Sequence, residues 1–328
     1  MTNHVVIICP YFGTINKAIH TLWLQGCAAN PNIRFLLLTD DEDALHMPMP
    51  QNVEGVFMRW DDCVALAKSK FEFEVALNDP YKLCDLKPAY GYVFSDYLEG
   101  CAFWGHLDNS DTILGDLRKF ITDDVLSAYD KVHSFGHLTL YRNTPEANMR
   151  FSIPPTCGTT IQELFSRSEV IGFDEMNHPW SINTIYKENG FSLLERIPDL
   201  VVDLQPDSYH FRIAEDNGIH IPRVLEWDHG RLYEITVQRE ANIAKREVGY
   251  VHFQKRKMVS EVPAGEQHFY MIPNRFIPAT ELLTREQIRD WSKDRLYLEP
   301  LRGRAKRILN YAKQPEVFVR KLKEKMSL

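Results

Sequence analysis

The sequence predicts a mixed α/β fold, in which buried strands alternate with amphipathic helices. The segments "HVVIICP" (residues 4–10) and "IRFLLLTDD" (residues 33–41) are each built on a short apolar run of the kind typical of buried strands, and the first run is rich in β-branched residues. A helix expected at residues 17–25 separates them, which is the pattern of a parallel β-α-β unit. The chain has 328 residues and is 44% hydrophobic, enough for a large core.

Polar and aromatic residues follow both of these strands. Ligands of open parallel sheets bind beyond the carboxyl ends of the strands. We therefore expect a nucleotide-binding role for Tyr11, Phe12, Gly13, Thr39 and Asp40, with Thr39 and Asp40 holding the edge of a base. Two plainer interpretations stay open: Tyr11 and Phe12 as core aromatics, and the Thr-Asp-Asp run as a helix cap.

The next segment predicts a helix preceded by a polar cluster. Pro88 suits a first helical turn, and apolar residues recur with helical spacing at Tyr90, Val93, Phe94, Tyr97 and Leu98. Just before it lie Lys82, Asp85 and Lys87, which we expect at the ligand site, near the positive end of the helix. Solvated charges or a local ion pair are the alternative.

A third buried strand, "CAFWGHL", ends in an acidic turn. The turn reads Asp108-Asn109-Ser110-Asp111. Mg²⁺ and Mn²⁺ prefer hard oxygen ligands, commonly one or two carboxylates together with substrate phosphate oxygens. Asp108 and Asp111 are therefore candidate metal ligands, although Asp, Asn and Ser also predominate in ordinary turns.

Later segments supply further candidates. "HSFGHLTLYRNT" predicts a strand whose polar ends carry Gly136, His137 and Arg142, which we assign to substrate, with a satisfied core histidine as the alternative for His137. Residues 192–240 have a β-rich pattern, and "VGYVHFQKRKM" predicts a strand ending in basic residues. There His252 is a candidate metal ligand and Lys255 a candidate diphosphate contact. Thr160 and Thr284 begin capping boxes before two helices.

Two acids downstream of the metal strand are candidates for a general base. A transferase that works by in-line attack of an acceptor hydroxyl needs a carboxylate that takes the hydroxyl proton. Asp174, and next to it Glu175, fit by type and position in "GFDEMNH". The alternative is an acid pair at the start of a helix, and a retaining enzyme would not need this base.

Charge and cysteine usage limit the class of protein. The net charge of −7 disfavours a broad nucleic-acid surface. Residues 301–328 carry nine Lys and Arg against two Glu, so the tail is about +7 and the remainder about −14. The basic tail predicts either contact with an anionic membrane surface or a helix packed on the acidic body. The six cysteines include no CxxC pair and are expected to be reduced core thiols, and no signal peptide is evident.

Taken together, eight motifs resemble a bacterial glycosyltransferase family of the GT-A fold, whose members are encoded with capsule or O-antigen synthesis enzymes. The motifs run in order from residue 5 to about residue 277: "CPYFG", "LLLTDD", "YKLCDLKPAYG", "FWGHLDNSDTILGDLRKF", "GHLTLYRNT", "FDE", "YVHFQKRKM" and "IPNRFI". The resemblance implies a UDP-sugar donor, Mn²⁺ or Mg²⁺ as cofactor, and transfer of a hexose such as galactose or galactofuranose. The acidic turn is one residue longer than an Asp-x-Asp motif, so Ser110 and Asp111 are alternatives for the second ligand.

The sequence thus predicts a GT-A-like domain over residues 1–283 and a basic helical extension over residues 284–328. The expected acceptor is a bacterial glycan or a polyprenyl-linked oligosaccharide, and the expected location is the cytoplasm or the inner face of its membrane. Two rivals remain. A sugar-nucleotide pyrophosphorylase would share the nucleotide site but normally has a Gly-rich first loop, and a degenerate scaffold would bind partners without turnover. No phosphate-binding GxxxxGK[ST] motif occurs.

Overall fold

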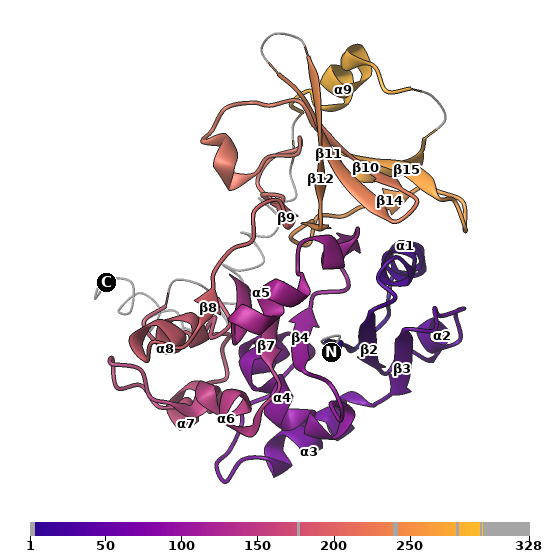
Figure 1. Ribbon diagram of the computed structural model, residues 1–328. Helices are drawn as coiled ribbons and strands as arrows, with labels where there is room; N and C mark the ends of the chain where they lie inside the picture. The colour runs from indigo at the N-terminus through magenta and orange to yellow at the C-terminus, as the bar shows by residue number, and fades with distance from the viewer. Residues whose placement is uncertain (1–3, 176–177, 239–241, 280–281, 296, 298–328) are drawn as a thin grey trace.

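The structure is a computed structural model that describes residues 4–175, 178–238, 242–279, 282–295 and 297. Strands within these ranges form sheets of seven, six and three strands. The seven-stranded sheet and its helices make the lower part of the molecule in Figure 1, and the six-stranded sheet makes the upper part. The mixed α/β fold predicted from the sequence is confirmed.

The seven-stranded sheet is parallel on one side and antiparallel on the other. Strands β3, β2, β1 and β4 run parallel, whereas β7 is antiparallel to β4 and to β6, and β6 is parallel to β8. The order is β3 (Val53–Phe57), β2 (Ile33–Thr39), β1 (Val5–Tyr11), β4 (Phe103–Leu107), β7 (Leu138–Arg142), β6 (Lys131–Phe135) and β8 (Leu193–Leu194). The strand predicted between Gly136-His137 and Arg142 is β7, and the residues just before it belong to β6, with which β7 pairs.

Both faces of this sheet are buried, which explains the uninterrupted apolar runs. Successive residues of β1 point to opposite faces, so Val6 and Ile8 join one core while Val5, Ile7 and Cys9 join the other. Helices α3 (Trp60–Ser69), α4 (Tyr90–Val93), α7 (Ile161–Phe165) and α8 (Ile182–Glu188) contribute to the first core. Helices α1 (Lys17–Ala28) and α5 (Asp123–Ala128) contribute to the second core. The short helices α2 (Glu42–Leu45) and α6 (Pro145–Asn148) complete this half.

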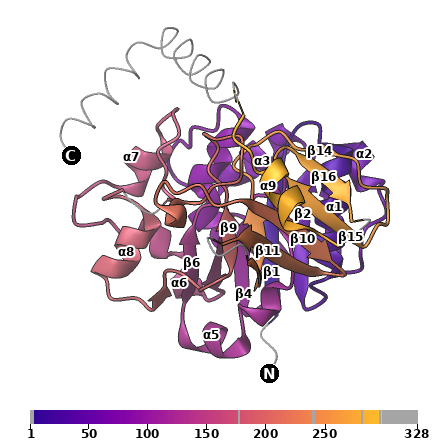
Figure 2. The same ribbon diagram turned by 90° about the horizontal axis from the view of Figure 1, so that it is seen from above.

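Helix α1 also connects the two halves of the molecule. Trp23 and Cys27 pack under the seven-stranded sheet, whereas Leu22 belongs to a third core that includes Trp227 and Phe269 of the six-stranded sheet. Seen from above, the six-stranded sheet lies over α1 and the first strands (Figure 2). A helix buried on two sides fixes the position of one sheet relative to the other.

The six-stranded sheet is mostly antiparallel. Its order is β12 (Ile243–Val248), β11 (Arg231–Val237), β10 (Arg223–Asp228), β15 (His268–Ile272), β16 (Arg275–Pro278) and β14 (Val259–Ser260). Helix α9 (Arg285–Trp291) begins at the predicted Thr284 capping box and buries Ile288 against Val224 and Ile235. The predicted β-rich character of residues 192–240 is thus confirmed.

A three-stranded sheet joins the halves. Strand β13 (Tyr250–His252) pairs antiparallel with β5 (Thr112–Leu114) and parallel with β9 (Val201–Asp203). The register places His252 opposite Thr112 on one side and opposite Asp203 on the other. The start of β5 and the ends of β9 and β13 therefore lie side by side, although β5 and β13 are more than a hundred residues apart in the sequence.

The predicted continuous helix over residues 88–98 is wrong. The chain instead forms a 3-10 helix over Pro80–Ala89, the single α-turn α4, and a second 3-10 turn over Ser95–Tyr97. Pro88 lies inside the first of these, where it supplies no N–H. Gly91 faces the ring of Trp104 so closely that a Cβ would lie 2.3 Å from it, so tertiary packing outweighs helical periodicity here.

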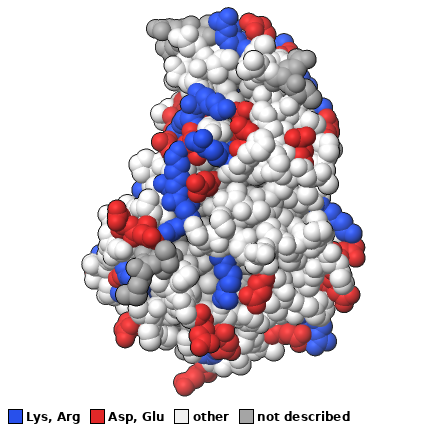
Figure 3. Space-filling model, turned by 45° about the vertical axis from the view of Figure 1, so that its right-hand side comes forward, with Lys and Arg blue, Asp and Glu red and all other residues white. Residues whose placement is uncertain are grey.

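Surface charge is mixed on the face shown in Figure 3, where acidic side chains lie beside a run of Lys and Arg. On strand β12, for example, Arg246 pairs with Asp199 and Glu234. The basic tail, residues 301–328, lies outside the described residues, so its membrane contact and its two helices stay predictions. No helix in the described ranges has the length and hydropathy needed to cross a bilayer.

We predict that Asn30→Ala will lower the free energy of unfolding by about 2–4 kcal/mol, because it leaves three buried backbone groups without partners. The Asn30 amide donates to the carbonyl oxygens of Gly26 (2.8 Å) and Gly115 (2.7 Å) and accepts from the N–H of Leu117 (2.8 Å). Urea unfolding measures the change. Asn189→Ala is the control, since Asn189 donates only to Ile185 in its own helix; equal losses in both variants would contradict the prediction.

Candidate functional site

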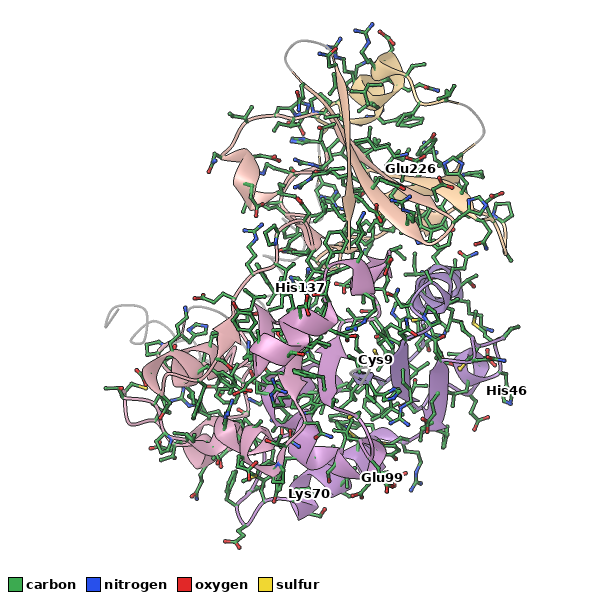
Figure 4. All side chains as sticks on the ribbon, in the orientation of Figure 1. Cys9, His46, Lys70, Glu99, His137 and Glu226 are labelled. Carbon is green, nitrogen blue, oxygen red and sulfur yellow. The ribbon has the colours of Figure 1, made fainter. Side chains whose placement is uncertain are left out.

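A cavity of about 890 Å³ opens beyond the carboxyl ends of β1 and β4. Its lining includes Tyr11 at the end of β1, Phe12 after it, the acidic turn after β4, and residues from the three-stranded sheet. Figure 4 shows one of its lining residues, His137, where the lower and upper parts of the molecule meet. The cavity therefore lies where open α/β sheets bind ligands.

The three-stranded sheet places an imidazole between two carboxylates. His252 Nδ1 lies 2.8 Å from Asp203 Oδ1, and His252 Nε2 lies 3.6 Å from Asp111 Oδ2. Burial acts to lower the pKa of His252, but hydrogen bonds and charge from Asp111 and Asp203 raise it to about 9. In the absence of a metal, the ring is thus a cation shared by two acids.

Asp111 has one satisfied oxygen and one orphaned oxygen. Its Oδ2 accepts a hydrogen bond from the backbone N–H of Lys255 at 2.8 Å. Its Oδ1 is buried and has no hydrogen-bond partner among the described residues. Burial acts to raise the pKa of Asp111, but the hydrogen bond with His252 and the nearby charges hold it below its ordinary value. A buried carboxylate oxygen without a donor is the kind of group that binds a cation.

The predicted metal ligands come together. One ligand atom from each of Asp108, Asp111 and His252 lies within 4.8 Å of the others. We call these three residues the outer site. Two carboxylate oxygens and one imidazole nitrogen suit Mn²⁺, and Mg²⁺ with additional oxygens from water or substrate. The residues present therefore fit the metal expected from the sequence.

Lys87 is the buried cation of the site. Its ammonium lies 2.7 Å from Asp108 Oδ1 and 3.4 Å from Asp174 Oδ2, and it donates to the carbonyl oxygen of Gly136 at 2.7 Å. Burial opposes the charge, yet Asp108 and Asp174 keep the pKa of Lys87 above its ordinary value. The 3-10 helix over residues 80–89 thus delivers Lys87 to the centre of the cavity, where it fixes two acids.

Asp174 is a buried carboxyl group in the lining of the cavity. Burial, opposed by Lys87 and reinforced by neighbouring acids, raises its pKa to about 7. Gly136 lies against it, because a Cβ there would come within 2.7 Å of Asp174 Oδ2. Glu175 also lines the cavity but is exposed. The two predicted acids therefore differ sharply in environment.

Lys82 and Asp85 do not reach the cavity, although the sequence suggested it. They form a fully buried ion pair of 2.7 Å, as the alternative interpretation proposed. Asp85 also accepts hydrogen bonds from the backbone N–H groups of residues 171–173, and Lys82 donates to the carbonyl oxygen of Glu169. The pair thus holds the loop that carries Asp174, which is a structural role behind the site.

Three residues expected at the nucleotide lie outside the cavity lining. Thr39 is fully buried, and Asp40 accepts from the N–H of Gly13 at 2.7 Å. The neighbouring Asp41 caps helix α2, as the alternative interpretation suggested. Asp40 and Asp41 brace the loop after β1 by accepting from the N–H groups of Gly13 and Ile15, and only Tyr11 and Phe12 of the predicted group line the cavity.

Arg142 lies at the wrong end of the sheet for a substrate contact. Strands β4 and β7 are antiparallel, so Arg142 pairs with Phe103 at the start of β4, whereas Asp108 follows the end of β4. Its guanidinium donates to Asp130 and to backbone carbonyl oxygens of residues 126–129. Gly136 and His137, at the other end of β7, do line the cavity.

Sequence reasoning missed Asp203 and the position of Tyr81. Asp203 ends the apolar run "VVD", the same signal that singled out Asp108, but its partner strand is 49 residues away. Tyr81 is exposed, and the ammonium of Lys255 lies 3.6 Å from its ring centroid. Lys255, as predicted, lines the cavity.

Comparisons with known proteins give one family match. A model of the family of unknown function DUF6625 matches residues 7–280. No curated protein matches the sequence. Among solved structures, mouse xyloside xylosyltransferase 1 has a TM-score of 0.34 and 8% identity, with 62% of this chain and 88% of that chain covered. The glycosyltransferase GlyE of Streptococcus pneumoniae TIGR4 has a TM-score of 0.31 and 11% identity, with coverages of 60% and 46%. At these TM-scores we draw no conclusion from either likeness.

We predict that Asp85→Ala will destabilise the protein by about 3–5 kcal/mol, because it leaves the Lys82 ammonium buried without its counterion. Asp62→Ala is the matched control, since Asp62 pairs with Arg59 at the same i,i+3 spacing on the surface. Thermal and urea unfolding of the two variants test this. Equal stability of Asp85→Ala and Asp62→Ala would contradict the structural role assigned to Asp85.

Proposed function

We propose that this chain, which belongs to the family of unknown function DUF6625, is a metal-assisted glycosyltransferase. It transfers a hexose from a UDP-sugar to a glycan or a polyprenyl-linked oligosaccharide. The observation that carries the proposal is the convergence of Asp108 and Asp111, from the turn after β4, and His252, from β13, on one cavity beyond the sheet. The sequence-level resemblance to bacterial surface-glycan transferases supports the same donor and acceptor classes.

The charge of the cavity supports a requirement for a metal. Among its described lining residues are six carboxylates and two lysines. The carboxylates are Asp79, Asp108, Asp111, Asp174, Glu175 and Asp203, and the lysines are Lys87 and Lys255. A diphosphate would be repelled from such a cavity on its own. A divalent cation held by the outer site would supply the positive charge that neutralises a departing diphosphate.

Two lysines would act on the donor side of the reaction. Lys255 is exposed at the edge of the cavity, where its ammonium can reach a phosphate oxygen. Lys87 is buried and holds Asp108 in place through the 2.7 Å contact. Positioning and electrostatic stabilisation of a developing phosphate charge are the main contributions that such a site makes to catalysis.

Asp174 has the properties of the general base. Its pKa of about 7 lets it hold and release a proton near neutral pH, as proton transfer from an acceptor hydroxyl requires. Lys87 and Gly136 fix the carboxyl group from two sides. In this scheme Asp174 accepts the hydroxyl proton while the acceptor oxygen attacks the sugar in line, which inverts its configuration. Glu175, exposed beside it, is the weaker candidate.

We predict that UDP will bind only together with Mn²⁺. With free ligand at 100 times its Kd, binding stabilises the fold by about 2.7 kcal/mol, which thermal unfolding detects. Asp108→Asn should weaken binding of UDP with Mn²⁺ by about tenfold or more, and the surface variant Asp96→Asn should not. Binding of UDP without metal would contradict the proposed metal requirement, and no response to any UDP-sugar would contradict the proposal and favour a scaffold. Pyrophosphate release from UTP and a sugar phosphate would favour the pyrophosphorylase.

We predict that the turnover rate will rise with pH through about 7 and then level off, because Asp174 acts in its deprotonated form and that form accumulates above its pKa. Asp174→Asn should lower the rate by roughly 10²- to 10⁴-fold and remove this pH dependence, while UDP with Mn²⁺ still binds. Glu175→Gln should retain the rise. A rise that persists in Asp174→Asn would assign the base to another group.

A further inference from the structure

A second group of metal-ligand type lies beside the outer site and shares His252 with it. One ligand atom from each of His137, Asp203 and His252 lies within 4.8 Å of the others. We call these three residues the inner site. The rings of His137 and His252 stack with centroids 4.1 Å apart, so both imidazoles lie next to Asp203.

His137 presents a nitrogen that has no partner. Its Nδ1 lies 2.8 Å from the hydroxyl of Tyr250, which in turn lies 3.3 Å from His133 Nε2. A Tyr250 hydroxyl that donates to His133 accepts from His137 Nδ1–H, which leaves a lone pair on His137 Nε2. That nitrogen is buried, has no hydrogen-bond partner within the described part of the chain, and lies 4.0 Å from Asp203 Oδ1.

His137 is buried, with the rings of His252 and Phe135 against it, and its Nε2 faces Asp203 Oδ1. Two acceptors face each other across 4.0 Å with no donor between them. Two ligands of a tetrahedral ion with bonds of about 2.1 Å lie roughly 3.4 Å apart, so a small approach of the two groups would allow them to share one ion.

The two sites differ in ligand chemistry. The outer site offers two carboxylates and one imidazole, which suits Mn²⁺ and Mg²⁺, whereas the inner site offers two imidazoles and one carboxylate, which suits Zn²⁺ and Co²⁺. His252 faces Asp111 through Nε2 and Asp203 through Nδ1. A neutral imidazole has one lone pair, so His252 can serve only one of the two sites at a time.

We propose that His137, Asp203 and His252 form a binding site for a borderline transition metal such as Zn²⁺, and that filling this inner site withdraws His252 from the outer site. Zn²⁺ would thereby oppose the binding of a Mn²⁺–nucleotide complex. The existence of the inner site follows from these three residues alone, while the competition rests on the proposed function.

Another histidine–carboxylate group does not carry the same inference. Glu226, Asp228 and His268 lie together in the six-stranded sheet, and Figure 4 shows Glu226 there, far from His137. His268 Nε2 lies 2.7 Å from Glu226, which also pairs with Lys245, so this ring nitrogen has a partner. In the inner site Asp203 Oδ1 likewise has partners in His252 and Gln254, but His137 Nε2 has none among the described residues. This group provides a control for zinc binding at an unrelated histidine.

The experiment is a calorimetric titration of the full chain with ZnCl₂, carried out on the wild type and on three variants. His137→Asn is the informative variant, because its amide can still meet the Tyr250 hydroxyl while Nε2 is lost. We expect it to weaken Zn²⁺ binding by roughly 10- to 100-fold or more. Mutating a residue that only hydrogen-bonds to a metal ligand already costs this much affinity, and His137 would be a ligand itself. Asp108→Asn and His268→Asn should bind Zn²⁺ as the wild type does. Thermal unfolding without metal checks that every variant is folded.

Two further readouts make the result decisive. Co²⁺ in place of Zn²⁺ should give a spectrum of nitrogen and oxygen ligands, whereas thiolate charge-transfer bands would show binding at a cysteine such as the exposed Cys157 and overturn the proposal. Zn²⁺ should also reduce the stabilisation by UDP and Mn²⁺ in wild type but not in His137→Asn.

Unchanged Zn²⁺ affinity in His137→Asn, or an equal loss in Asp108→Asn, would refute the inner site. Zn²⁺ binding that depends on His137, in a protein that binds no UDP with Mn²⁺, would support the inner site and refute the proposed function. The two inferences can therefore fail separately.

Discussion

The pairing of β13 with β5 and β9 is the constraint on which the rest of the site depends. Strand β13 has only three residues, yet it is hydrogen-bonded on one side to β5, which follows the acidic turn, and on the other side to β9. Because β9 and β13 are parallel, Asp203 and His252 end side by side. Because β5 is antiparallel to β13, Asp111 arrives at the same end from the opposite direction. Three short strands thus assemble what no single segment contains.

Buried charge is the second organising feature, and it is arranged in two layers. Lys82 and Asp85 form an ion pair that is buried away from solvent, and Asp85 accepts hydrogen bonds from the backbone of residues 171–173. Lys87, five residues after Lys82, faces the cavity and contacts Asp108 and Asp174. Buried pairs of this kind add little net stability, but they specify one arrangement, because any other leaves a charge without a partner. The raised pKa of Asp174 is a consequence of this arrangement.

The excess of carboxylates over lysines around the cavity gives the site its chemical character. A cavity of this sign recruits cations first and anionic ligands only through them. The ring of His252 lies between Asp111 and Asp203, which raise its pKa to about 9 and so favour the cation. Metal binding there must displace a proton, and which nitrogen loses it decides which neighbouring acid the metal joins. The outer and inner sites are two outcomes of that one choice.

The sequence by itself determined the strands, the helix α1 between them, and the acids at strand ends, because burial on both faces requires long apolar runs and turns require Asp, Asn and Ser. It identified Asp108, Asp111, His252, Lys87 and Asp174 by residue type and position, and all five line one cavity. It did not predict that Lys87 faces the cavity while Lys82 does not, because the two point to different sides of a 3-10 helix that the sequence did not reveal. It placed Arg142 at the site because the direction of β7 relative to β4 was unknown. Only the tertiary structure decided that Asp203 joins His252 and that His137 stacks on it, because strand pairing between distant segments depends on packing that local pattern does not encode.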